Sequence, residues 1–145
     1  MSRLDSATAA TTAFATGIVL IALTGCAQIG DVISKQHRED FPTYEAAADG
    51  WVGVDIPDWI PDDATDLRNL ATLDETVSVM RVVTDTDLAG SCETAPRTGL
   101  PQLAADWSTE VWPDDVQRCG DYEVMAMEDG WLGWFEAEEP GQTPN

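Results

Sequence analysis

The segment DYEVMAMEDGWLGWFEAE, residues 121–138, carries the strongest structural pattern in the chain. Two runs rich in apolar residues flank Asp129-Gly130, a dipeptide favoured in the tight turns of β-hairpins. Successive side chains of a strand point to opposite faces, so Trp131 and Trp134 should lie on opposite sides of the sheet. The segment therefore predicts a β-hairpin over about 121–136.

A second hairpin is predicted earlier in the chain. The run ETVSVMRVVT, residues 75–84, is rich in the β-branched residues that favour strands, and a tight connection separates it from DLRNLATL, residues 66–73. A further strand is expected over 51–56, where WVGVDI alternates with a period of two. Short helices are expected within 85–92, where Gly90 would end a helical turn, and at about 102–107.

The amino-terminal region is predicted to be a targeting segment. Residues 13–24, AFATGIVLIALT, are apolar, but a helix that spans a bilayer needs about 20 such residues. The apolar region of a signal peptide is shorter, at about 7–15 residues, and this run fits it.

The tetrapeptide Leu23-Thr24-Gly25-Cys26 follows and resembles the lipobox of bacterial lipoproteins. In that family the cysteine receives a diacylglyceryl group, and signal peptidase II then cuts before it. The resemblance implies a signal peptide over 1–25, a lipidated Cys26, and an anchor on the extracytoplasmic face of the cell membrane. The alternative is an uncleaved membrane anchor that happens to contain a cysteine.

The remaining two cysteines are expected to pair. Lipidation of Cys26 leaves Cys92 and Cys119, which outside the cytoplasm can form a disulfide. Closing this loop would stabilise the fold by roughly 3–4 kcal/mol on the chain-entropy description. The alternative is a pair of buried free thiols.

These patterns predict an α+β fold: a small, mainly antiparallel β-sheet domain with at least four strands, one or two short helices and one disulfide. The globular domain is expected over 51–136, after a tether over 26–50 that exposes His37 to solvent. Residues 137–145 are expected to form a disordered acidic tail.

The mature region also resembles small lipoproteins of actinobacteria. The resemblance starts from IPDWIPDDATDLR, residues 56–68, and extends through the cysteines to the DGWLGW hairpin near residue 135. It supports the domain boundaries and implies no mechanism.

The charge of the chain limits its partners. Seven basic and 27 acidic residues give a net charge of −20, which argues against binding to nucleic acid and against electrostatic docking on anionic lipid. A solvated, self-repelling surface explains such a charge, and a surface for a cation or a basic partner is the alternative.

Catalytic and metal-binding patterns are not evident in the sequence. His37, the one histidine, lies in the predicted tether, away from any candidate nucleophile. The run DTDLAGSCETAP, residues 85–96, fails as a calcium loop because Ala89 and Pro96 stand where oxygen ligands are needed. No metal site and no cofactor are expected.

Tryptophans are the best candidates for ligand contact. All six lie between residues 51 and 134, where aromatic side chains serve either as core or as a contact surface. The candidate binding residues are Trp131, Trp134 and Trp59, and the outward-facing member of the Trp131/Trp134 pair is the best of them.

The functional expectation is a membrane-anchored extracytoplasmic lipoprotein that acts as a binding or envelope-accessory module for an envelope protein or glycan. The alternatives are a small carboxylate-dependent hydrolase acting on envelope material and an assembly partner of a larger envelope complex.

Overall fold

The computed structural model describes residues 35–52 and 55–144 of the chain. The predicted signal peptide, the lipobox and Cys26 lie outside the described residues. None of the helical residues in the described part forms a segment long and apolar enough to cross a bilayer.

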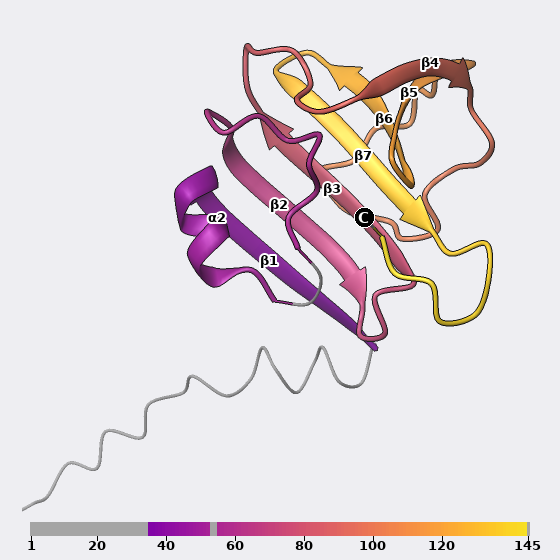
Figure 1. The fold of residues 1–145 in the computed structure, drawn as a ribbon, viewed down its shortest axis with the longest axis horizontal. Coiled ribbons are helices and arrows are strands. Elements are labelled where there is room, and N and C mark those ends of the chain that lie inside the picture. Colours follow the sequence, from indigo (N-terminus) through magenta and orange to yellow (C-terminus); the bar gives the residue numbers. More distant parts are fainter. Residues whose placement is uncertain (1–34, 53–54, 145) are drawn as a thin grey trace, which may run out of the picture.

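The described chain forms a seven-stranded sheet with the order β1-β2-β3-β7-β6-β5-β4 (Figure 1). Every neighbouring pair is antiparallel, which confirms the predicted antiparallel sheet. One helix, α2, lies beside β1 (Figure 1). The elements are β1 Gln36–Thr43, α2 Tyr44–Gly50, β2 Thr65–Thr72, β3 Val77–Val83, β4 Cys92–Pro96, β5 Asp115–Cys119, β6 Tyr122–Met127 and β7 Gly130–Glu136.

The β6–β7 hairpin confirms the pattern that opened the sequence analysis. Its turn lies one residue earlier than expected, because Met127 pairs with Gly130 and leaves Glu128 and Asp129 as the two-residue loop. Gly130 is therefore the first residue of β7, with φ of 154°. A side chain at this position would collide with the backbone oxygen of Val82 on β3, so only glycine fits.

The β2–β3 hairpin is also confirmed, with Ala71 opposite Ser78 near its turn. The register shifts between Thr65 and Arg68, and Asp66 within this shift has a positive φ of 46°. This irregularity is a β-bulge, which bends the strand and increases its twist.

The domain begins earlier than predicted, because β1 and α2 occupy residues 36–50 of the expected tether. β1 pairs with β2 from Gln36 to Thr43. Thr43 then caps α2, its side-chain oxygen accepting a hydrogen bond from the Ala46 amide. β1 escaped prediction because its inward-facing side chains include His37 and Glu39, whose polar neighbours lie on β2, in the β2–β3 turn and in the chain after α2.

Several expected elements do not form. The segments 51–52 and 55–57 belong to no strand, and neither 85–92 nor 102–107 is helical. Trp51 and Ile56 instead pack against the core from irregular chain. Pro57 and Pro61 restrict the chain around the first of these regions, and Pro101 directly precedes the last.

Both faces of the sheet are covered, one by α2 together with irregular chain and the other by irregular chain alone. Each face has its own apolar cluster. We name the helix face as the side covered by α2 and the segments 51–52 and 55–64; its core includes Trp59, Leu67, Met80, Tyr122 and Phe135. We name the loop face as the side covered by the segment 97–114; its core includes Leu70, Val79, Leu103, Leu132 and Trp134.

The disulfide is confirmed and fastens the edge of the sheet. Cys92 on β4 lies directly opposite Cys119 on β5, with their Cα atoms 4.3 Å apart. β4 is the outermost strand on this side, so the bond ties an edge strand to its only neighbour in the described sheet.

The residues after β7 follow the fold instead of fraying as predicted. The Ala137 amide donates to the Thr76 carbonyl at 2.8 Å, and the side-chain oxygen of Gln142 accepts from the Glu138 amide at 3.0 Å. Pro144 is buried.

Candidate binding site where the sheet divides

Two of the three predicted contact tryptophans belong to the core. Trp59 and Trp134 are 1% and 4% exposed. Trp59 packs over Gly133, whose missing side chain makes room for the indole ring. Trp134 meets Trp112 edge to face, with ring centroids 5.5 Å apart. Both buried tryptophans therefore stabilise the fold and are out of reach of a ligand in this conformation.

Trp131 is the predicted contact residue that remains accessible. It packs against the helix-face cluster, whereas Trp134 belongs to the loop-face cluster, so the predicted opposition of the two side chains is confirmed. The Trp131 indole N–H donates to the Thr86 carbonyl at 3.1 Å. This bond fixes the half-buried ring at the edge of its cluster.

Trp131 lies beside a point where β5 and β6 separate. The two strands pair at Cys119↔Tyr122, Arg118↔Glu123 and Gln117↔Val124, and no further. β6 nevertheless continues to Met127, while the first residues of β5 pair only with β4. The sheet is therefore divided between β5 and β6 beyond Val124.

A groove of about 470 Å³ opens at this division, and it is the candidate functional site. Its walls are mainly apolar and aromatic, and they come from both sides of the sheet. We define the divided-sheet groove by its lining residues: Val111, Trp112, Pro113, Asp115, Gln117, Val124, Met125, Ala126 and Trp131.

Sequence reasoning found one wall of this groove and missed the other. Trp112 packs against the loop-face cluster and faces the groove, and Val111 beside it is 79% exposed. The signal available in the sequence was the adjacent pair Val111 and Trp112, which directly precedes Pro113. Local pattern gave no indication that this segment would meet β6.

The groove has an acidic character. Asp115 lines it, and Asp114, between the lining residues Pro113 and Asp115, is exposed. Within the described ranges, no lysine or arginine is among its lining residues. With a net charge of −20 on the whole chain, the groove favours cationic over anionic groups.

One buried carboxylate, Glu123, holds the Trp112 segment against the loop face. Glu123 is 7% exposed, and its oxygens accept hydrogen bonds from the Thr98 amide at 2.7 Å and the Trp134 indole at 3.1 Å. The Thr98 hydroxyl, the Gly99 amide and the Arg118 guanidinium also donate to it. This carboxylate therefore positions the start of the covering segment 97–114.

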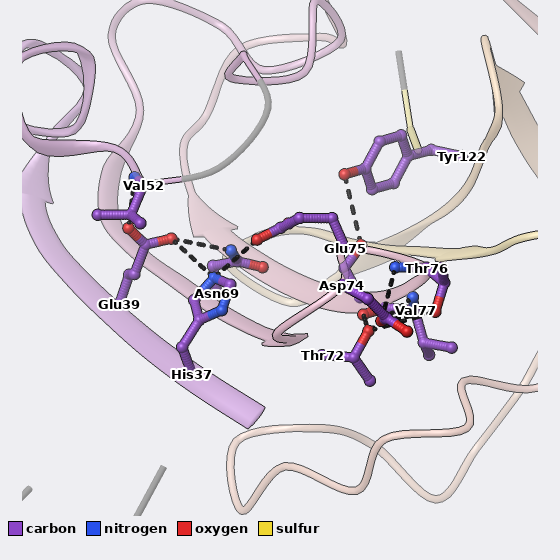
Figure 2. Close-up of polar contacts among 11 residues, drawn as sticks. His37, Glu39, Val52, Asn69, Thr72, Asp74, Glu75, Thr76, Val77 and Tyr122 are labelled. Atoms are coloured by element: carbon purple, nitrogen blue, oxygen red, sulfur yellow. Dashed lines mark hydrogen bonds and ion pairs between the residues drawn. The ribbon is translucent and has the colours of Figure 1, made fainter. Parts of the chain in front are cut away.

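A second polar cluster lies on the helix face, remote from the groove along the sheet (Figure 2). His37 is half-buried here and not exposed as predicted; its Nε2 lies 3.4 Å from a Glu75 oxygen and 3.7 Å from a Glu39 oxygen. Glu39 accepts hydrogen bonds from the Val52 amide at 2.8 Å and from Asn69 at 3.1 Å. Both Glu39 oxygens are thus occupied, which makes this residue a clamp for the chain after α2.

Two groups near this cluster have a pKa above its ordinary value. Desolvation raises the pKa of Glu75; His37 opposes this shift, whereas Glu39 and Asp74 add to it. Burial raises the pKa of Tyr122 to about 12, against the effect of the hydrogen bond from Ser78. The folded chain therefore favours the protonated forms of Glu75 and Tyr122.

Neither a metal-binding cluster within the described residues nor similarity to a known protein assigns a function to the chain. Among residues 35–52 and 55–144, no group of three or more histidine, cysteine or acidic side chains is arranged to hold a metal ion. No protein-family model matches the chain, and no curated protein or solved structure shows significant similarity to it.

Proposed function

We propose that the protein is a lipid-anchored binding module on the extracytoplasmic side of the cell membrane, and that its ligand occupies the divided-sheet groove. The observation that carries the binding role is the pair of tryptophans in this groove. Trp112 and Trp131 reach it from opposite faces of the sheet. Ligand sites are commonly concave, mostly apolar and lined by aromatic side chains, with a few polar groups that orient the ligand.

The position of the groove suits a molecule anchored through Cys26. β1 forms one edge of the sheet, and β6 lies four strand spacings from it, which puts the groove about 19 Å away from β1 at the usual spacing of strands. Gln36 is ten residues after Cys26 along the chain, and ten residue steps reach at most about 35 Å. An anchor joined to β1 would leave the groove free to face away from the membrane.

The anchor is tested by metabolic labelling with palmitate. The wild-type chain should incorporate label and sediment with membranes, whereas Cys26→Ser should do neither. Continued labelling of the Cys26→Ser variant would refute the lipid anchor without bearing on the groove.

The binding role is tested by titrating the full-length chain in detergent with peptides, envelope glycan fragments and calcium while recording tryptophan fluorescence. At least one titration should give a saturable change that Trp112→Leu or Trp131→Leu removes. Trp51→Leu is the matched control, because Trp51 is half-buried and stacks on Phe41 away from the groove. A response that survives both groove variants, or none to any ligand, would contradict the proposal.

A further inference from the structure

We propose that the divided-sheet groove binds an extended, cationic stretch of polypeptide, which adds to the sheet as a short strand beside β6. This inference rests on the binding role proposed above and specifies the class of ligand. Three properties of the groove support it: the direction of the β6 main chain, the arrangement of the two tryptophans, and the distribution of charge.

The main chain of β6 directs an unpaired position into the groove. Met127 and Gly130 flank the two-residue turn, and such closing pairs exchange hydrogen bonds. Ala126, the next residue of β6, therefore points its N–H and C=O away from β7 and toward the β5 side. Val124 has the same orientation and meets Gln117, but Ala126 has no partner on β5 in the described sheet.

Ala126 is also exposed, so its peptide groups are accessible from the groove. An extended segment can pair with such a free strand edge, because its own N–H and C=O groups replace the missing neighbour. The free part of β6 runs from Met125 to Met127 and spans roughly 10 Å, enough for a short segment only.

The two tryptophans match the geometry of an added strand. Successive side chains of a strand point to opposite faces of the sheet. One side chain of the added segment would meet Trp131 on the helix face, and the next would meet Trp112 on the loop face. Indole faces attract ammonium and guanidinium groups as well as apolar side chains.

The charge of the groove selects a basic segment. Asp115 lines the groove, and the exposed Asp114 lies between two lining residues, Pro113 and Asp115. No lysine or arginine of the described groove lining neutralises these carboxylates. Lysine or arginine side chains of a ligand could therefore form ion pairs with them. A neutral glycan would stack on the tryptophans but leave the main chain of Ala126 and the carboxylates without partners.

The experiment uses the full-length chain in detergent and a blocked peptide of alternating lysine and valine, (Lys-Val)₃. We expect saturable quenching of tryptophan fluorescence that weakens as salt is raised. The matching glutamate peptide, (Glu-Val)₃, should bind at least about tenfold more weakly. A lysine peptide methylated on alternate backbone nitrogens keeps its charge and side chains but cannot pair as a strand, and it should also lose about tenfold.

The protein side is tested at Ala126. Ala126→Pro removes the N–H that faces the groove and should bind about tenfold more weakly than Ala126→Val, which also enlarges the side chain but keeps the N–H. Near-ultraviolet circular dichroism checks the fold of both variants. If Ala126→Pro fails to fold, the methylated peptide decides the question alone.

The outcomes separate this inference from the function on which it rests. Equal binding of methylated and unmethylated peptides, or of lysine and glutamate peptides, would overturn it. Binding of a chitin or peptidoglycan oligosaccharide in place of the lysine peptide, abolished by Trp131→Leu, would overturn the inference and leave the binding role intact. Failure of every ligand would overturn both.

Discussion

Glu39 on the helix face and Glu123 on the loop face are two buried carboxylates with the same task in different surroundings. They are 9% and 7% exposed, and each accepts a hydrogen bond from a backbone amide of the segment that covers its face. Glu123 has a guanidinium, a hydroxyl, an indole and two amides as donors. Glu39 has one amide and one carboxamide, with the titratable His37 and Glu75 beside it.

The comparison shows that a buried carboxylate can be stabilised by two different sets of neighbours. Around Glu123, donors surround the carboxylate and one of them carries a full positive charge. Around Glu39, both hydrogen-bond donors are neutral, and desolvation raises the pKa of the nearby Glu75. The loop face should therefore depend strongly on its carboxylate, and the helix face should respond more to pH.

The largest effect is expected from Glu123→Ala. Removing the carboxylate leaves buried donors without partners and isolates Arg118, so the free energy of unfolding should fall by about 3–5 kcal/mol in urea denaturation. Glu128→Ala, an exposed carboxylate on the same hairpin, is the control and should change stability by less than about 0.5 kcal/mol. Similar losses for both variants would contradict the clamp at Glu123.

A smaller loss is expected from Glu39→Ala. The Asn69 amide and the Val52 N–H would lose their acceptor, at a cost of about 1–3 kcal/mol in the same measurement. Asp40→Ala is the matched control, because Asp40 is the next residue of β1 and is exposed. If Glu39→Ala were as damaging as Glu123→Ala, the distinction between the two faces would fail.

Tyr122→Phe should cost about 1 kcal/mol at neutral pH, because it removes one buried hydroxyl and its contact with Ser78. Since burial raises the pKa of Tyr122 to about 12, the folded protein resists its ionisation. The stability that this neutral hydroxyl maintains is complete below pH 10 and is lost between about pH 10 and 12. Absorbance at 295 nm should show a tyrosinate signal in that range that Tyr122→Phe lacks.

The smallest effect on stability is expected from Asp74 and Glu75, two adjacent carboxyl groups whose pKa values are shifted in opposite directions. The pKa of Glu75 is raised, so its contribution is present below the unfolded pKa and is lost as pH rises through the folded value. Hydrogen bonds from Thr72 and Thr76 lower the pKa of Asp74, so its contribution is lost as pH falls. Urea denaturation across the acidic range measures both.

Relative to the wild type, Glu75→Gln should gain stability with rising pH and Asp74→Asn should lose it. Parallel pH profiles for the two variants would show that His37 and the surrounding solvent offset the effect of burial on the pKa of Glu75. That result would remove the pH sensitivity assigned to the helix face.

The hairpins were predictable from sequence, and the rest of the sheet was not, for physical reasons. The β-branched run 75–84 and the turn after Met127 encode their strands locally. β1 carries polar residues on its inward side, and its partners lie on β2 and in the β2–β3 turn, so its sequence resembled an exposed tether. The segment 51–56 alternates like a strand but finds no neighbouring strand to pair with in its described part.

The site was predictable in the same partial way. Trp131 was a candidate because of its place in a hairpin, whereas the burial of Trp59 and Trp134 depends on segments that cover them from elsewhere in the chain. The groove depends on β5 turning from β6 toward β4. The pairing of β5 with β4 at this point depends on residues far apart in the sequence, so no local sequence pattern indicates it.

The strand order also governs how the chain folds. β1-β2-β3 and β4-β5-β6-β7 are two meanders that each join sequence neighbours, and a single pairing, β3 with β7, unites them. That pairing brings Val83 to Gly130 and must await the closure of a long loop, so it should limit the folding rate, since non-local contacts form slowly. The disulfide lies wholly within the second meander, so its oxidation can precede the joining of the halves. The disulfide can therefore form either before or after β3 pairs with β7, and the chain has two routes to the same native sheet.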